Sequence, residues 1–270
     1  MRHWAVWVMA VVLLGTGLFF IQHSVTDAKQ ISSEVLNWNF KPAKDQQPAD
    51  ADPHYKELLK EYDGVFMGCP QDKSLYLTFD NGYENGYTKQ VLDVLKEKEV
   101  PAAFFITGHY LTTETDLINR MIKEGHIVGN HSYHHPSLPE VSEERVKREL
   151  TKLKEEYKEI TGEEYMPYLR PPQGKFSEES LSLSRDLGYI NVFWSLAYKD
   201  WETDNQKGAD YAYEQIMNRI HPGSIMLLHS VSKDNAEALG RVIDECRKQG
   251  YEFKSLDDLM MKKTMRKFHP

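Results

Sequence analysis

The chain of 270 residues has few cysteines and no excess of positive charge, and both shortages restrict its function. Its two cysteines, Cys69 and Cys246, allow at most one disulfide, and the alternative is two unpaired thiols with Cys246 on the buried face of a helix. A net charge of −8 argues against nucleic acid as a partner. Internal repeats and low-complexity tracts are also absent. We therefore expect one α/β catalytic domain, at about residues 57–265.

Near the amino terminus, a long stretch of the chain contains no charged residue. Residues 4–21 are apolar or small and follow Arg2 and His3, which is typical of a secretory signal peptide or an N-terminal membrane anchor within residues 1–28. The segment's length falls between the two, so a cleaved signal and a membrane tether through residues 4–21 both stay open, with a buried helix as a third alternative. Residues 29–56 contain three prolines and show no sustained period, which predicts a spacer. The sequence thus indicates an exported protein.

Short apolar runs alternate with segments that have a helical period. Seven runs are predicted strands: Leu75–Phe79, Ala102–Thr107, Ile127–Gly129, Tyr168–Leu169, Ile190–Ser195, Ser224–Leu228 and Glu252–Lys254. Six segments between them are predicted amphipathic helices: Lys89–Lys98, Glu114–Glu124, Ser142–Ile160, Ser177–Leu187, Ala209–Arg219 and Asn235–Gln249. This alternation favours a parallel sheet with right-handed crossovers, and seven units favour a distorted or incompletely closed barrel.

Local signals mark the ends of these helices. Thr112 or Thr113 is a predicted N-cap for the second helix, and Ser142 is one for the third. Four glycines follow the last residues of helices, where a left-handed conformation is common: Gly125, Gly162, Gly188 and Gly250.

Six polar residues each follow the end of an apolar run. The carboxyl ends of parallel strands meet at one face of an α/β barrel, where active sites are built. We therefore expect one pocket to contain Asp80, His131, His135, Arg170, Asp200 and His229.

Two of these residues are suited to bind a metal. His131 and His135 are four positions apart after a strand, so their imidazoles can point the same way. Such a pair can bind zinc or another borderline transition metal and leave positions open for water and substrate. Structural histidines are the alternative.

Five segments resemble, in order and spacing, the motifs of the polysaccharide deacetylases known as carbohydrate esterase family 4, or NodB-like deacetylases. They are Thr78-Phe79-Asp80-Asn81-Gly82, His131-Ser132-Tyr133-His134-His135, Arg170-Pro171-Pro172-Gln173-Gly174, Asp200-Trp201 and Leu227-Leu228-His229. The resemblance extends from about residue 74 to residue 260. It implies a distorted (β/α)7 barrel of the NodB-homology type that removes acetyl groups from N-acetylated sugars with a divalent metal ion.

A longer pattern, from Phe79 to Thr88, resembles the subgroup that deacetylates N-acetylmuramic acid in peptidoglycan, a step towards the muramic δ-lactam of the spore cortex. The implied partner is the glycan strand of peptidoglycan. Two alternatives stay open. One is an N-acetylglucosamine deacetylase acting on peptidoglycan or chitin-like oligosaccharides, and the other is an inactive glycan-binding barrel.

Amide hydrolysis suggests roles for these residues. Asp80 is placed to act as general base and His229 as general acid. Arg170 would keep Asp80 ionised, and Asp200 would hold either His229 or Arg170. Each has a structural alternative: a surface ion pair for Arg170, a loop cap for Asp200 and a core position for His229.

Two positions depart from the family pattern. Most members have an aspartate as third metal ligand where this chain has Asn81, whose amide oxygen can coordinate but adds no charge; the muramic subgroup shares this Asn. Gln173 stands where a cation could meet the lactyl carboxylate of muramic acid, and it can donate a hydrogen bond but form no ion pair. Three aromatic residues are expected either to stack on sugar or to pack in the barrel: Tyr83, Tyr198 and Trp201.

Overall fold

The computed structural model describes residues 31–44 and 47–268. The central sheet has seven strands, and each overlaps one of the seven predicted: β4 (Ser74–Asn81), β5 (Ala102–Ile106), β6 (Ile127–Asn130), β7 (Tyr168–Leu169), β9 (Ile190–Asn191), β10 (Ile225–His229) and β11 (Glu252–Phe253). The order is β10-β4-β5-β6-β7-β9, with β11 beside the amino end of β4, and all pairs are parallel. The predicted parallel α/β architecture is confirmed.

The run predicted as a strand from Ile190 to Ser195 is regular only over β9. Beyond Asn191 the chain changes partner, because Val192 forms a parallel bridge with Val65 and Leu196 forms one with Met226 of β10. The backbone N–H of Leu227 donates to Leu196 O at 2.8 Å. The bridge between Leu196 and Met226 joins the two ends of the sheet, so the barrel closes through a single bridge and is distorted.

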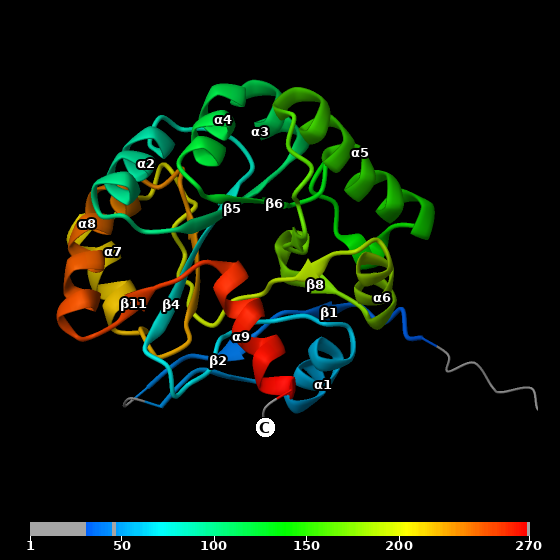
Figure 1. The fold of residues 1–270 in the computed structure, drawn as a ribbon, viewed down its shortest axis with the longest axis horizontal. Coiled ribbons are helices and arrows are strands. Elements are labelled where there is room, and N and C mark those ends of the chain that lie inside the picture. The colour runs from blue at the N-terminus through cyan, green and yellow to red at the C-terminus, as the bar shows by residue number, and fades with distance from the viewer. Residues whose placement is uncertain (1–30, 45–46, 269–270) are drawn as a thin grey trace, which may run out of the picture. The chain divides into compact units, whose positions relative to one another are not determined.

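All six predicted helices are present: α2 (Thr88–Glu97), α4 (Thr115–Lys123), α5 (Glu143–Thr161), α6 (Glu178–Asp186), α7 (Ala209–Met217) and α8 (Lys233–Lys248). Figure 1 shows α8, α2, α4, α5 and α6 following one another in an arc around the strands. Ser142 accepts a hydrogen bond from Arg145 N as the predicted N-cap, and Gly162 ends α5 with φ 78°. The four predicted glycines all have positive φ.

Three further helices were not predicted: α1 (Pro53–Glu61), α3 (Gly108–Thr113) and α9 (Leu256–Phe268). Because α3 occupies the residues before α4, the N-cap prediction for Thr112 or Thr113 is wrong. Both threonine hydroxyls donate to carbonyls within α3, and Glu114 is the N-cap of α4. Two 3-10 turns, η1 (Leu138–Glu140) and η2 (Pro172–Gly174), complete the helical elements in the part of the chain that the structure describes.

Side chains of β4 alternate between two cores, as the two-residue period of a strand requires. Leu75, Leu77 and Phe79 face the helices, whereas Tyr76 faces the barrel interior with Phe105. The amino end of this interior is covered by α9, which buries Leu256 and Leu259 there. Asp80 is in step with Tyr76, so the same alternation directs it into the barrel at the carboxyl end.

The segment from residue 31 to residue 56 is not a spacer. Residues from Ile31 onward belong to the same compact unit as the barrel. Within the segment, β1 (Leu36–Asn37) pairs with β8 (Lys175–Phe176), and β2 (Phe40–Lys41) pairs with β3 (Asp50–Ala51). Trp38 is 8% exposed and donates Nε1–H to Trp194 O at 3.0 Å. Two-residue strands and a single buried ring produce no hydrophobic period in the sequence. The sequence pattern therefore could not predict that this segment is folded.

Two further expectations can be compared with the structure. Cys69 and Cys246 are free thiols, so they form no disulfide. The apolar segment 4–21 lies outside the described residues. Within residues 31–44 and 47–268, no helix has the length and apolarity needed to cross a bilayer.

Candidate active site

A buried ion pair lies at the carboxyl end of the barrel. Asp80, the last residue but one of strand β4, accepts a hydrogen bond from Arg170, which directly follows β7, with 2.7 Å between Oδ1 and Nη1. The Arg170 side chain is fully buried; its Nε donates to Val192 O and its guanidinium lies 4.2 Å from the centre of the Phe105 ring. Burial alone would raise the pKa of Asp80, but the charge of Arg170 holds that pKa below its usual value. Asp80 is therefore a buried carboxylate.

Two imidazoles meet beside this pair. The Nε2 atoms of His131 and His135 are 3.2 Å apart, and His131 Nε2 lies 3.5 Å from Asp80 Oδ2. His131 Nδ1 is 2.8 Å from the carbonyl oxygen of Arg170, so Nδ1 carries the proton and Nε2 keeps its lone pair. Burial lowers the pKa of His131 to about 4 and also lowers that of His135. Both rings are therefore neutral near pH 7, as metal ligands must be.

The loop that carries the histidines is held in an unusual conformation. Ser132 and His135 have φ of 62° and 59°, in the left-handed region. Ser132 N donates to Asn130 Oδ1 at 2.8 Å, and His135 N donates to Ser132 Oγ at 3.0 Å. Glu149, buried on α5, accepts hydrogen bonds from His134 N and Nδ1, so His134 turns away from the histidine pair. Sequence reasoning missed the supporting residues Asn130 and Glu149.

The donor set fits a borderline metal ion. Two nitrogens bound to one ion at about 2.1 Å are separated by roughly 3.0–3.4 Å, which matches the 3.2 Å between the His131 and His135 Nε2 atoms. Asn81 donates Nδ2–H to Ser230 Oγ at 2.7 Å, and its buried Oδ1 has no hydrogen-bond partner among the described residues. No group of three or more His, Cys, Asp or Glu suited to a metal occurs in the described residues.

A second carboxylate holds a third histidine. His229 ends β10, and its Nδ1 is 2.7 Å from Asp200 Oδ1. Asp200 Oδ2 also accepts from the backbone N of His229 and from Asn235 Nδ2. Burial alone would lower the pKa of His229, but the charges of Asp200 and then Asp80 raise it above its usual value. The structure therefore joins Asp200 to His229 and Asp80 to Arg170, and leaves Nε2 as the free ring nitrogen of His229.

These side chains open into one cavity of about 740 Å³. Its lining includes Asp80, His131, His135, His229, Tyr83 and Trp201. Tyr83 and Trp201 are 45% and 49% exposed, and the Trp201 ring centre lies 5.5 Å from that of His229. Three lining residues that sequence reasoning missed are His109, Thr112 and Tyr133. The first two belong to α3, a helix too short to give a periodic signal.

The cavity lining does not include Gln173, a predicted substrate contact, or Tyr198, which was expected either to stack on sugar or to pack in the barrel. Gln173 is exposed in η2 with φ 61°. Tyr198 donates its hydroxyl to Asn235 Oδ1 and so belongs to the support of Asp200. The interpretation of Tyr198 as a packing residue, which the sequence left open, agrees with this position.

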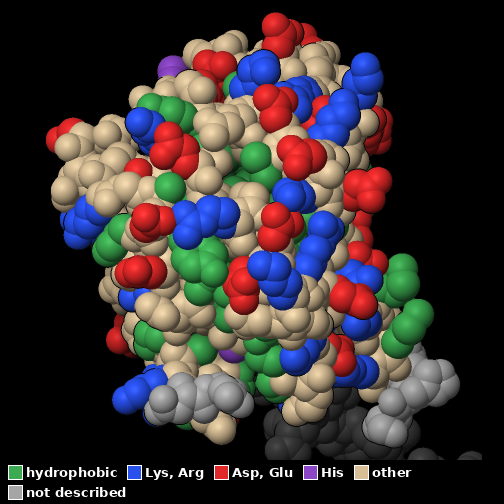
Figure 2. All heavy atoms as spheres, turned by 90° about the vertical axis from the view of Figure 1, so that its left-hand side faces the viewer, with side chains coloured by type: hydrophobic (Ala, Val, Ile, Leu, Met, Phe, Trp, Pro, Cys, Tyr) green, Lys and Arg blue, Asp and Glu red, His purple; other side chains and the backbone are tan. Residues whose placement is uncertain are grey.

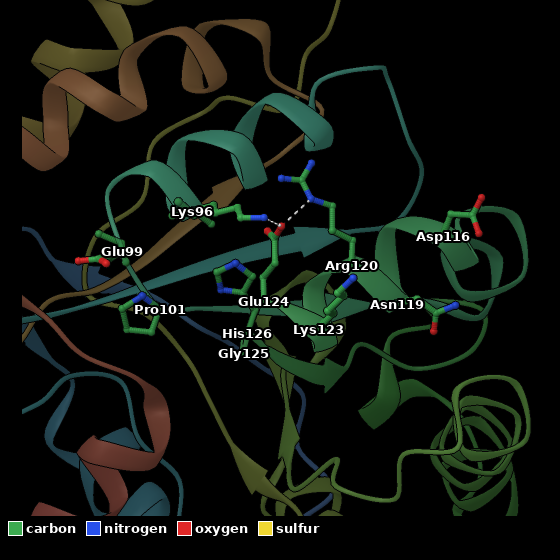
Figure 3. A pocket seen from close by; sticks show the side chains of 12 residues that line it. Lys96, Glu99, Pro101, Asp116, Asn119, Arg120, Lys123, Glu124, Gly125 and His126 are labelled. Atoms are coloured by element: carbon green, nitrogen blue, oxygen red, sulfur yellow. Dashed lines mark hydrogen bonds and ion pairs between the residues drawn. The ribbon is translucent and has the colours of Figure 1, made fainter.

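A larger hollow, of about 810 Å³, lies at the opposite end of the barrel, where α2 and α4 flank the residues before β5 and β6 (Figure 3). Lys96 and Arg120 point towards Glu124 there, with ion-pair distances of 3.3 and 3.1 Å. None of the predicted catalytic residues lines this hollow. The residues suited to hydrolysis are gathered in the smaller cavity at the carboxyl end.

This fold and site are those expected of a polysaccharide deacetylase, and comparison with known families agrees. The family model for polysaccharide deacetylase matches residues 67–192. The chain belongs to the polysaccharide deacetylase family.

Individual relatives give finer comparisons. Peptidoglycan-N-acetylmuramic acid deacetylase PdaA of Bacillus subtilis is 49% identical over 95% of this chain and 95% of its own length. The solved structure of Bacillus subtilis PdaA, a family 4 carbohydrate esterase, matches with a TM-score of 0.84 and 50% identity and covers 86% of this chain and 100% of that one. A peptidoglycan-N-acetylglucosamine deacetylase of Bacillus cereus is 29% identical over 77% of this chain and 76% of its own length.

Proposed function

We propose that this protein hydrolyses the N-acetyl group of N-acetylmuramic acid residues in peptidoglycan. The observation that carries the proposal is one cavity in which a buried carboxylate, a histidine pair and a histidine paired with a carboxylate converge. Similarity to PdaA over nearly the whole length of both chains supports the muramic substrate. Through the family resemblance, the product is a step towards the muramic δ-lactam of the spore cortex.

Asp80 is the general base in this proposal. It accepts the proton of the attacking water at Oδ2, because Oδ1 already accepts from Arg170 at 2.7 Å. Arg170 is a positioning residue. Its fully buried guanidinium keeps Asp80 ionised and holds Oδ1 through one hydrogen bond.

His229 is the general acid. Its Nδ1 is engaged by Asp200, so Nε2–H is free to give its proton to the departing sugar nitrogen. Asp200 stabilises the protonated ring and sets its orientation, and Asn235 in turn fixes Asp200. The two titratable groups thus have opposite tasks and oppositely shifted pKa values.

His131, His135 and Asn81 Oδ1 are the proposed metal ligands, with zinc or another divalent transition metal as the ion. When bound, such an ion supplies Lewis-acid chemistry: it polarises the acetyl carbonyl and lowers the pKa of water. The carbonyl of Arg170 orients His131, and Ser230 orients the Asn81 amide.

Recognition of the sugar is assigned to the exposed aromatic rings of the cavity, Tyr83 and Trp201. We also propose that Gln173 contacts the lactyl group. Because Gln173 is exposed outside the cavity, only a long substrate can reach it. The proposed place of action is outside the cytoplasm, at the wall. A signal peptide or a tether at residues 4–21 remains a prediction from the sequence.

Acetate release by the full chain tests the reaction, with purified peptidoglycan and chitin oligosaccharides as substrates and Asp80→Asn as the matched inactive variant. Acetate should be released from peptidoglycan, and its release should be reduced roughly 10²-fold or more in Asp80→Asn. Acetate from chitin oligosaccharides, with deacetylated glucosamine in the wall, would replace the proposal by the second substrate class. Wall binding without acetate from either form would indicate the inactive glycan-binding barrel.

A further inference from the structure

We propose that the end of the barrel opposite the active site docks on a bilayer rich in anionic phospholipid, through a surface formed by α9, α1 and the loops beside them. We define this basic face by its cations: Lys41, Lys44, Lys56, Lys60, Lys262, Lys263 and Arg266. The proposal does not depend on the reaction that the enzyme catalyses.

The basic face surrounds two adjoining hollows. One, of about 310 Å³, lies between α1 and α9, and the other, of about 700 Å³, is lined by residues from 41–44 and 47–50. They share Lys56, Phe66, Met67 and Gly68, so they form a continuous surface. The smaller hollow has an apolar floor that includes Leu59, Phe66 and Leu259. A hollow with an apolar floor and a cationic rim suits an amphipathic anion.

Charge is segregated on this surface. Among the residues that the structure describes, the two hollows are lined by the seven cations and by two acidic residues, Asp50 and Asp72, whereas the whole chain carries −8. Asp50 pairs with Lys56, and Asp72 pairs with both Lys262 and Arg266. The side chains of Lys262 and Arg266 are still 45% and 53% exposed, and exposed pairs of this kind are weak enough for phosphate to replace the carboxylate.

The contrast with the helical side of the barrel is clear. Figure 2 shows that side, over α2, α7 and α8, with Lys and Arg interleaved among Asp and Glu. There the charges are matched across helices, as in Lys98 with Asp244 and Arg241 with Asp210. An excess of cations is therefore a property of the basic face and does not extend to α2, α7 and α8.

Exposed apolar side chains on α9 favour a bilayer over a soluble polyanion. Met261 and Met265 are 58% and 57% exposed and are one helical turn apart, so they share the outward face of α9. Lys262 and Arg266 follow them in sequence and flank that face. Apolar side chains bordered by cations suit the boundary between headgroups and acyl chains, whereas a polyanion in water gives methionine no apolar partner.

The basic face and the catalytic cavity lie at opposite ends of the barrel, which gives docking a functional consequence. α9 covers the amino ends of the strands, and the catalytic cavity lies at their carboxyl ends. β4 has eight residues, so the two surfaces are separated by roughly 25 Å of strand. A molecule docked through the basic face presents its catalytic cavity away from the membrane. Figure 1 shows α9 lying across the strands next to α1.

Oxidation footprinting of the full chain tests the proposal, because it reads the two methionines directly whether or not residues 4–21 also bind lipid. The protein is treated with hydrogen peroxide alone, with phosphatidylcholine vesicles and with vesicles containing phosphatidylglycerol, and each methionine is followed by mass spectrometry. Met261 and Met265 should be protected by phosphatidylglycerol vesicles only, and high salt should remove the protection.

The variant Lys262→Gln/Arg266→Gln should need about tenfold or more lipid for half protection. Lys147→Gln/Lys233→Gln is the matched control, since it removes two paired cations from α5 and α8, and its protection should be unchanged. Equal oxidation of Met261 and Met265 with and without phosphatidylglycerol overturns the proposal. So does retention by poly(glycerol phosphate) without vesicle protection, which would make the partner a soluble polyanion.

Discussion

Asp80 and Arg170 are 90 positions apart in sequence, yet they form a buried ion pair with 2.7 Å between Oδ1 and Nη1. The contact joins the end of β4 to the residue after β7, across two intervening strands of the barrel. It fixes the proposed base and closes the interior around Phe105. One contact therefore contributes to both the site and the fold.

The Arg170→Met variant should lose much of its stability, because it leaves the Asp80 carboxylate buried without its partner. We expect the free energy of unfolding to fall by about 3–5 kcal/mol, measured by urea denaturation. Arg185→Met is the control: Arg185 pairs with Asp186 on the surface, and its loss should cost less than about 1 kcal/mol. Equal losses in the two variants would contradict a structural role for the buried pair.

The Asp200→Asn variant should shift the pH dependence of the reaction. Asp200 raises the pKa of His229 against the effect of burial, so His229 stays protonated to higher pH in the parent enzyme. Without that carboxylate the pKa falls, and the proton is lost at lower pH. The alkaline limb of kcat/KM should therefore move to lower pH. Activity at neutral pH should fall roughly 10²-fold or more.

Asp204→Asn, in the exposed loop nearby, is the control for this shift and should leave the profile unchanged. An unchanged alkaline limb in Asp200→Asn would exclude His229 as the acid that Asp200 tunes.

The Asn81→Asp variant should bind a divalent metal more tightly, because a carboxylate adds charge to the two imidazoles. Competition with a chromophoric chelator should show an affinity higher by about tenfold. Asn205→Asp, on an exposed loop, should leave the affinity unchanged. Equal metal affinity in Asn81→Asp and the parent protein would remove Asn81 from the ligand set.

Trp38→Ala tests whether the segment before α1 is part of the folded unit. Trp38 is 8% exposed and packs against Phe66 and Phe193, so its removal should cost about 3–5 kcal/mol of unfolding free energy. Trp201→Ala is the matched control, because that ring is 49% exposed. It should raise KM and change stability by less than about 0.5 kcal/mol. An unaltered midpoint in Trp38→Ala would restore the spacer interpretation.

The strands and helices of the barrel could be predicted because each has a local signature. β4 is an apolar run that ends in Asp80, and α5 repeats apolar residues between Ser142 and Gly162. The segment from residue 31 has no such signature, because the contacts that bury Trp38 include Phe193 and Trp194, which are more than 100 positions away. Long-range packing of this kind leaves no periodic trace in the sequence.

Part of the candidate site could be predicted for the same reason. Asp80, His131 and His229 could be assigned to one face because each ends or follows a strand. The sequence could not predict whether Asp200 pairs with His229 or with Arg170. The pairing depends on how the loop after β9 returns to β10. Likewise, no local pattern shows that the Gln173 side chain lies outside the cavity, because its direction depends on the left-handed conformation of Gln173 in η2, with φ 61°.

The most direct test is the reaction itself, followed on purified peptidoglycan with the full chain and with Asp80→Asn. After incubation, the glycan is digested with a muramidase and the fragments are weighed by mass spectrometry. The account predicts free acetate and muramic acid residues lighter by one acetyl group, both reduced roughly 10²-fold or more in Asp80→Asn. Acetyl groups lost from glucosamine instead, or no acetate with any divalent metal, would contradict it.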